Sequence, residues 1–309
     1  MYNNLKNFLS YLSILIETFL FIKFKKKKII IKHNINEISK LEKCKFLFTC
    51  QDGLFLLDKN LIIKLLPGFC FGLTKINEAE FYIYRDYSIK GNIYRIKIDF
   101  DKNLITNLKK IKINLPPNVH QILYIDEVLY IADTKENSIS RVYEEKFMDK
   151  NYIEGELLYS KKSDNYKHFN SLTLYNDDLY LLAHNYSQYS KKKSQIYILN
   201  KNLEIKEKLD NFGECSHDIL FHEGMMYICD SLNSRILNSQ KKEVFKSNKF
   251  LRGFKKFEDN FFILGGSDYN ERAKRTSTNA YIYILDNNFK LIQNLEIKGI
   301  GPLFDILVI

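Results

Sequence analysis

The stretch His217-Asp-Ile-Leu-Phe-His-Glu-Gly-Met-Met-Tyr-Ile228 decides the fold of this 309-residue chain. It consists of an apolar run, a short polar turn and a second apolar run, which is the pattern of two strands joined by a tight turn. Related stretches occur at residues 71–83, 120–131, 170–181 and 252–263. The aromatic residue of each second strand measures the repeat, with steps of 48, 50, 47 and 35 residues between Tyr82, Tyr130, Tyr180, Tyr227 and Phe262.

Each hairpin is followed by a third strand and usually a fourth, and four strands at this period are the signature of a β-propeller blade. Residues 44–66 supply three strands that lack a first strand, whereas residues 303–309 supply one strand without successors. Joining the two ends would remove an open sheet edge. We therefore predict an all-β, six-bladed propeller over residues 29–309, closed by the C-terminal strand. Its other five blades begin near residues 69, 119, 169, 216 and 251.

Composition restricts the class of protein. Hydrophobic residues make up 45% of the chain and charged residues 27%, which excludes wholesale disorder. The formal net charge is +10, but outside residues 25–28 and 191–193 the basic residues are scattered among acids, so nucleic acid is not a favoured partner. Five cysteines without a CxxC motif indicate neither a disulfide framework nor a zinc ribbon. We expect buried thiols and a reducing, cytoplasmic location.

The first 28 residues form a separate segment. Residues 8–24 are mostly apolar, and their polar positions recur at spacings of 4, 3 and 4 from Lys6 to Glu17, which places them along one stripe of a helix. The run is too short and too interrupted for a membrane span of about 20 residues. We predict an amphipathic helix and basic run over residues 1–28. This segment either packs against the propeller or associates with an anionic membrane surface.

The repeat predicts that polar residues from separate blades meet at one mouth of the central channel, because the first strand of each blade lines that channel. Counting ten residues back from each aromatic, and adding the closing strand, gives one column: Gly72, His120, Asn170, His217, Arg252 and Phe304 or Asp305. In an enzyme, His217 and His120 would be the catalytic nucleophile or general base. Asn170 and Arg252 would bind the ligand and stabilise developing negative charge.

The ends of the second strands supply an outer ring on the same face. Its ligand-binding candidates are His184 and Asp230, together with Arg272 and Arg275 from a long loop that would reach over the mouth. Asp230 has a structural alternative, because aspartate commonly caps turns.

The residue types of both rings favour an anion as the ligand. Arginine offers a planar fork of donors, and asparagine and imidazole side chains can also donate. Phosphate, sulfate, a carboxylate or an acidic sugar would suit such a site. Zinc, copper or iron would suit the two histidines, but a nearby arginine would repel a dication, and calcium would require carboxylates. We predict no metal site, and the residues identify no cofactor.

Two functions stay open at this point. The first is binding of a small anionic ligand at the channel mouth, with or without hydrolysis or group transfer. The second is a non-catalytic scaffold that holds a protein partner through the aromatic and basic loop at residues 186–193. A channel blocked by Phe304 would favour the scaffold, whereas an open polar pocket of roughly several hundred cubic ångströms would favour the ligand.

Short phrases around the predicted ring resemble those of a known group of propellers. They are Asn170-Ser171-Leu172, His217-Asp218-Ile219, Tyr227-Ile228-Cys229-Asp230-Ser231, Arg252-Gly253 and Gly265-Gly266-Ser267. The chain resembles six-bladed propellers related to the NHL, SMP-30 and arylsulfotransferase-like groups, most closely uncharacterised bacterial members, over residues 44–309. SMP-30-type lactonases hold calcium through Glu, Asn and Asp, of which the ring has only Asn170. Arylsulfotransferases use channel histidines and an arginine, and His120, His217 and Arg252 are similar in residue type.

Overall fold

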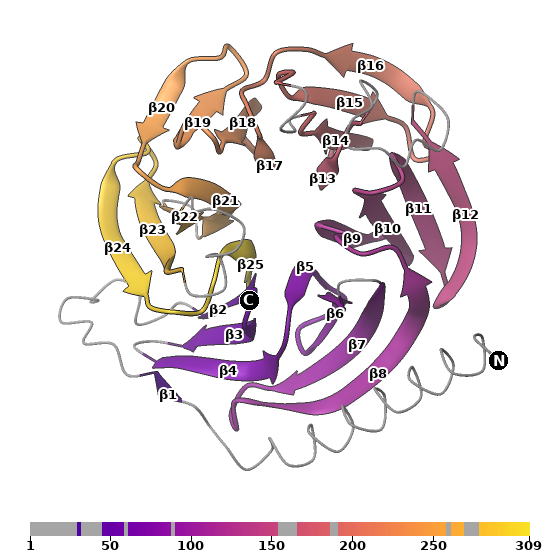
Figure 1. Cartoon of the computed structure of the whole chain (residues 1–309), viewed down its shortest axis with the longest axis vertical. Coiled ribbons are helices and arrows are strands. Elements are labelled where there is room, and N and C mark those ends of the chain that lie inside the picture. The colour runs from indigo at the N-terminus through magenta and orange to yellow at the C-terminus, as the bar shows by residue number, and fades with distance from the viewer. Residues whose placement is uncertain are drawn as a thin grey trace.

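Six antiparallel sheets surround a central channel in the computed structural model, which describes residues 30–31, 45–58, 61–87, 90–153, 166–185, 191–257, 261–268 and 278–309 (Figure 1). The predicted helix over residues 1–28 lies outside the described residues. In the described part of the chain, no helix has the length and apolar character needed to cross a membrane.

The blades are numbered one to six from the blade that contains both ends of the described chain. Blade one contains β1 (Ile30–Ile31), β2 (Lys45–Cys50), β3 (Gly53–Asp58), β4 (Leu61–Pro67) and β25 (Leu303–Val308). Blade two contains β5 (Cys70–Lys75), β6 (Glu80–Asp86), β7 (Gly91–Asp99) and β8 (Leu104–Leu115), and blade three contains β9 (Gln121–Ile125), β10 (Val128–Asp133), β11 (Ser138–Tyr143) and β12 (Lys146–Tyr152). Blade four contains β13 (Phe169–Tyr175), β14 (Asp178–Ala183), β15 (Gln195–Leu199) and β16 (Ile205–Leu209). Blade five contains β17 (His217–His222), β18 (Met225–Asp230), β19 (Arg235–Asn238) and β20 (Glu243–Lys246), and blade six contains β21 (Phe250–Phe257), β22 (Phe261–Ser267), β23 (Ala280–Asp286) and β24 (Leu291–Ile297).

The C-terminal strand completes blade one, as the sequence predicts. Strand β25 pairs antiparallel with β2, with Phe48 opposite Ile306 and Thr49 opposite Asp305. It also contacts β5 of blade two and β21 of blade six, so the ring of inner strands is closed. One feature was not expected from the sequence: β1 pairs with β4 and adds a fifth strand to the outer edge of this blade.

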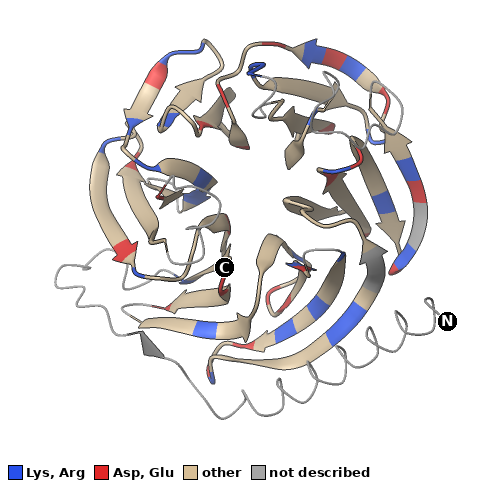
Figure 2. Ribbon diagram, in the orientation of Figure 1, with Lys and Arg blue, Asp and Glu red and all other residues tan. Residues whose placement is uncertain are grey.

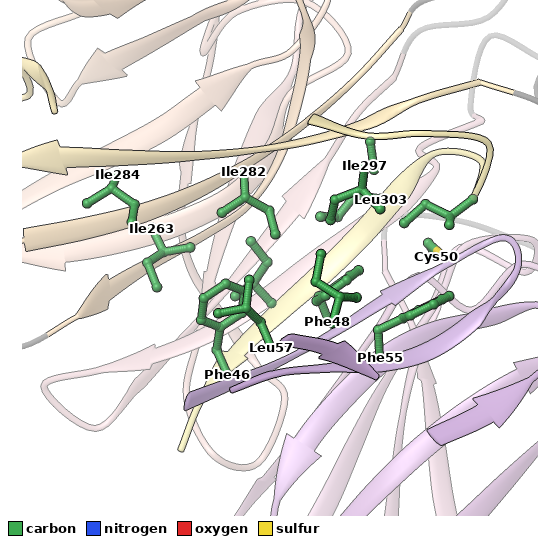
Figure 3. Packing of buried hydrophobic residues seen from close by; sticks show 14 of the residues in the cluster. Phe46, Phe48, Cys50, Phe55, Leu57, Ile263, Ile282, Ile284, Ile297 and Leu303 are labelled. Carbon is green, nitrogen blue, oxygen red and sulfur yellow. The ribbon is translucent and has the colours of Figure 1, made fainter. Parts of the chain in front are cut away.

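Apolar side chains pack between neighbouring blades. At the closure, Phe48 stacks on Phe55 with ring centroids 5.2 Å apart, and both face the isoleucines of blade six, such as Ile282 and Ile284 (Figure 3). Charged residues lie mainly elsewhere. Figure 2 shows lysine and arginine spread over outer strands of several blades and interspersed with acids on β12 and β16.

A side-chain oxygen bridges each of the six blade junctions. In most of them, a polar residue near the start of one inner strand accepts a hydrogen bond from a backbone amide of the next inner strand. Asp305 Oδ2 accepts from the Leu73 amide (3.2 Å), and Asp218 Oδ2 accepts from the Gly253 amide (2.8 Å). The other acceptors, each with its donor amide, are Thr74 with Tyr124, Gln121 with Leu172, Ser171 with Asp218, and Ser267 of β22 with Leu303.

Two of the donor amides, those of Asp218 and Gly253, belong to β-bulges of the inner strands. The pairing register shifts by one residue in β5, β13, β17, β21 and β25, close to the channel mouth. A bulge leaves one residue unpaired within its own sheet and re-aims its side chain. Gly253 lies at such a bulge with a φ of 68°. A Cβ atom there would lie 2.9 Å from Ile306 Cγ1, so this junction requires glycine both for its backbone conformation and for close packing.

Truncation tests the closure. Deleting residues 303–309 would expose the edge of β2 and remove the inner strand of blade one, so we expect aggregation or loss of cooperative thermal unfolding. Deleting Ile309 alone removes one backbone hydrogen bond to Lys45 and should leave a cooperative transition. Circular dichroism melting of both proteins checks this, and an unchanged melting temperature in the longer deletion would contradict the closure.

Two glycine substitutions separate backbone strain from packing. Gly299 has a φ of 71° and no atom within 4 Å of the position of an added Cβ. We expect Gly299→Ala to destabilise the fold by roughly 1–2 kcal/mol through the left-handed backbone alone. Gly253→Ala should cost about 1–3 kcal/mol more, because Ile306 and Leu303 must also move. Urea unfolding of both variants measures the difference, and equal losses would show that the bulge is not tightly packed.

Candidate functional site

Every position of the predicted column except Gly72 lines one small cavity at the channel mouth. The lining column residues are His120, Asn170, His217, Arg252, Phe304 and Asp305, joined by Phe71, Gln121 and Asp218. The sequence count placed Gly72 in this column, and that position is wrong by one residue. The connection between β5 and β6 puts Tyr82 opposite Thr74, eight residues earlier, whereas Tyr130 lies opposite Leu123, seven residues earlier. Phe71 therefore occupies the place expected for Gly72.

Four of the six histidines form a cluster beside this cavity, which we call the histidine cluster: His120, His168, His184 and His217. The His168 and His184 rings stack with centroids 4.2 Å apart, and His184 meets His217 edge to face at 5.5 Å. His120 lies 5.0 Å from His168 and 6.1 Å from His217. The sequence analysis missed His168, because it precedes β13 and lies outside the counted column. Among the described residues, no group of three or more His, Cys, Asp or Glu side chains is arranged to hold a metal ion.

Hydrogen bonds orient the His217 ring. Its Nδ1 lies 2.7 Å from the Cys215 carbonyl oxygen and 2.9 Å from Ser231 Oγ. A carbonyl can only accept, so Nδ1 carries the proton and donates it. Ser231 in turn donates to the Leu251 carbonyl at 2.7 Å. The Nε2 of neutral His217 is consequently an acceptor, and this buried atom has no hydrogen-bond partner among the described residues.

Asn170 presents a second acceptor. It occupies the bulge of β13, and its Nδ2 donates to the Ser216 carbonyl at 2.8 Å, which ties blade four to blade five. Its Oδ1 is buried and makes no hydrogen bond with the described part of the chain. Asn170 and His217 are each only 3% exposed. Two desolvated acceptors therefore line the same cavity.

Aromatic rings and Arg252 narrow the mouth. Phe71 lies 4.3 Å from Phe304 and stacks on His120 at 4.8 Å. The Arg252 guanidinium lies over the rings of Phe250 and Phe304, at 5.0 and 5.4 Å from their centroids. The free volume left in the cavity is about 10 Å³, room for about one water molecule.

A positively charged side chain, that of Lys255, lies beside two of the carboxylates that line the cavity. Lys255 Nζ lies between Asp218 Oδ1 (3.4 Å) and Asp305 Oδ1 (3.6 Å), which come from blades five and one. Burial raises the pKa of Asp305 to about 6, although the positive charge of Lys255 acts in the opposite direction. These carboxylates also accept the junction hydrogen bonds, so the floor of the cavity is part of the framework of the fold.

Burial and Arg252 keep His184 and His217 neutral. Desolvation, followed by the charge of Arg252, lowers the pKa of His184 to about 3. The same two causes lower the pKa of His217 well below its usual value of 6.5. At neutral pH these two imidazoles are uncharged, so neither contributes a positive charge to the binding of an anion.

The residues predicted for the outer ring lie in different environments. His184 is buried in the histidine cluster but does not line the cavity. Asp230 is fully buried and accepts hydrogen bonds from the Glu214 amide of the loop before β17 (2.7 Å) and from Arg235 Nε (2.8 Å). These contacts are structural, although they do not cap the turn after β18. Arg272 and Arg275 lie outside the described residues.

Comparisons with known proteins support the fold. No protein-family model and no curated protein matches the chain. A protein from Lactobacillus plantarum has a similar structure, with 12% sequence identity, a TM-score of 0.60 and coverage of 86% of this chain and 99% of that chain. A chain of a nidogen/laminin complex is similar at 11% identity and a TM-score of 0.60, covering 85% of this chain and 97% of that chain. A Bacteroides fragilis protein, provisionally named a 6-phosphogluconolactonase, is similar at 12% identity with a TM-score of 0.53, covering 84% of this chain and 83% of that chain. At these identities the likeness shows the propeller fold alone.

The lowered pKa of buried His184 predicts acid sensitivity. His184 stays unprotonated when folded, whereas the unfolded chain takes up a proton below a pH of about 6.5, so its contribution to stability is present above pH 6.5 and is lost as the pH falls toward 3. Asp305 acts oppositely between its folded pKa of about 6 and its usual pKa of 3.8, because the folded state holds a proton more tightly there. We therefore measure the difference between proteins: His184→Phe should lose less stability than the wild type between pH 6.5 and 4.

Arg252→Gln should also reduce this loss, by a smaller amount, because it removes the charge but leaves the burial of His184. Arg141→Gln is the matched control, since Arg141 pairs with Asp149 on blade three, away from the mouth. Urea unfolding at several pH values measures each curve. Parallel curves for the wild type and His184→Phe would show that His184 does not titrate in this way.

Proposed function

We propose that the channel mouth binds a small hydroxylated organic anion, such as a hydroxy acid or a sugar acid. The observation that carries this proposal is the pair of buried acceptors without partners, His217 Nε2 and Asn170 Oδ1, in a cavity also lined by Arg252. A buried polar atom without a hydrogen bond costs roughly 1–3 kcal/mol. A hydroxyl donated to these atoms would remove that cost, while the guanidinium would attract the acid group.

The acceptors narrow the class of anion. Sulfate and a fully ionised phosphate have no proton to donate, so they cannot satisfy His217 Nε2 and Asn170 Oδ1. A hydroxy acid supplies both a donor and a negative charge. The cavity volume of about 10 Å³ also fits a hydroxy acid, because it accommodates one hydroxyl-sized group. The remainder of the ligand would lie above the cavity.

Binding is favoured over catalysis. A general base works best when its pKa lies near the working pH, and burial together with Arg252 lowers the pKa of His217 far below neutrality. The Nε2 atom is therefore a weak base. Hydrolysis or group transfer by His217 and His120 has less support than recognition without reaction.

The scaffold is the second candidate, because the mouth is narrow. Phe71, Phe304 and Arg252 leave far less than the roughly 300 Å³ typical of a small-molecule pocket. In this alternative the same face holds a protein partner, and the buried acceptors take up water.

Paired ligands test the proposal. Lactate and propionate have the same charge and differ by one hydroxyl. In calorimetric titrations, lactate and the sugar acid gluconate, which both carry hydroxyls, should bind saturably. Propionate and sulfate, which have no hydroxyl to donate, should not bind. Arg252→Gln should weaken gluconate binding by about tenfold or more, because a hydrogen bond to a charged group contributes about 1.5–3 kcal/mol. Arg141→Gln, on blade three, should bind as the wild type does.

The outcomes separate the two candidates. Equal binding of lactate and propionate would show that the acceptors do not select a hydroxyl. Absence of binding by every hydroxy acid in the panel would leave the scaffold as the better account. Unchanged affinity in Arg252→Gln would place the anion elsewhere.

A further inference from the structure

A second, larger cavity lies between blades two and three. It has a volume of about 340 Å³ and is lined by residues of β6, β7, β8, β9, β10 and β11 and of the turns beside them. His120 precedes β9, whereas Asp126 and Glu127 follow it, so this turn lies at the opposite end of β9 from the histidine cluster. Figure 1 shows blades two and three side by side. We call this cavity the inter-blade groove. Its volume lies within the roughly 300–1,000 Å³ range of small-molecule sites.

The wall of the groove is aromatic and aliphatic. Tyr82 and Tyr124 meet edge to face with ring centroids 5.2 Å apart, beside Ile111, Leu129 and Val142. Tyr82 is only 5% exposed, yet its hydroxyl makes no hydrogen bond with any described residue. Burial raises the pKa of this hydroxyl to about 12, so it stays protonated at neutral pH. The groove thus combines an apolar wall with a protonated hydroxyl.

The rim of the groove carries excess negative charge. Arg95 is compensated by Glu80 (2.8 Å) and by Glu145 (3.1 Å), and Lys109 is compensated by Glu145 at 2.5 Å. Glu127 and Glu144 also line the groove, but neither forms an ion pair or a side-chain hydrogen bond with the described part of the chain. Two carboxylates therefore remain without a countercharge at the edge of an aromatic wall.

The two free carboxylates occupy costly backbone positions. Glu127 and Glu144 belong to two-residue hairpin turns and have φ values of 62° and 46°. Such turns favour Asn-Gly or Asp-Gly, because a longer side chain is strained at positive φ. Strained residues of this kind often serve a site. The acidic side chains stand at these turns despite the local preference of the backbone.

We propose that the inter-blade groove binds an organic cation on an apolar stem. The ammonium or guanidinium group would pair with Glu127 and Glu144, and the stem would lie against Tyr82 and Tyr124, whose ring faces attract cations. A free amine and the side chain of a lysine or arginine in a peptide share this chemistry. The groove lies away from the channel mouth, so this inference does not depend on the function proposed there.

Three probes with one aromatic body and different charge test the proposal. Phenethylamine is cationic, 2-phenylethanol is neutral and phenylacetate is anionic. In ligand-observed NMR titrations of the full chain, we expect saturable binding of phenethylamine, at least about fivefold weaker binding of the alcohol, and no binding of the acid. A second arm uses the blocked dipeptide amides Ac-Leu-Lys-NH₂ and Ac-Leu-Arg-NH₂. Tighter binding of these peptides than of the amine would identify a peptide as the source of the cation.

Matched variants locate the site. The double variant Glu127→Gln/Glu144→Gln keeps both side-chain shapes and should weaken phenethylamine by about fivefold or more. The control Glu207→Gln/Glu223→Gln makes the same change of net charge on blades four and five and should leave the affinity unchanged. Arg252→Gln should also bind phenethylamine normally, which separates this site from the mouth. Thermal melting confirms that each variant is folded.

Three results would overturn the inference. Equal affinities of the amine, the alcohol and the acid would show a non-selective apolar crevice. Equal affinities of the double variant and the wild type would place the amine elsewhere. Absence of saturable binding in both the amine and the peptide arms would show that the groove does not recognise cations.

Discussion

Hydrogen bonds from backbone amides to side-chain oxygens join the six blades around the channel, and the remainder of the structure depends on them. Apolar packing between sheets is non-directional, so packing alone does not determine how the inner strands align with one another. Each junction therefore carries a directional contact, such as the one from the Gly253 amide to Asp218 or from the Leu73 amide to Asp305. These contacts tie residues far apart in the sequence, and those of the C-terminal strand close the ring.

β-Bulges of the inner strands lie beside the channel mouth. In several inner strands, one residue faces the mouth and the next bridges the junction, as in His120 and Gln121 or His217 and Asp218. The bridging residue holds the neighbouring blade in place. The residue before it faces the cavity, and Asn170 does both, because its Nδ2 also ties blade four to blade five. A tightly connected channel can therefore also present histidine, asparagine and arginine.

The channel mouth and the inter-blade groove differ in the polar groups that they present. At the mouth, burial and the charge of Arg252 keep His217 neutral, so the cavity presents acceptors beside a cation. In the groove between blades two and three, the arginine and lysine are already paired, and carboxylates remain beside two tyrosines. The net charge of +10 predicts neither situation, because the local balance depends on which charges are already compensated.

The sequence by itself determined the propeller, its closure by the C-terminal strand and the convergence of His120, Asn170, His217 and Arg252, because period and strand alternation are properties of the chain alone. Only the tertiary structure decided which atoms remain available. The β5–β6 connection placed Phe71 where Gly72 was expected, His168 entered the histidine cluster from outside the counted column, and His217 became an acceptor through the Cys215 carbonyl. Hydrogen-bond partners, desolvation and cavity size depend on neighbours from other blades, and no single repeat contains that information.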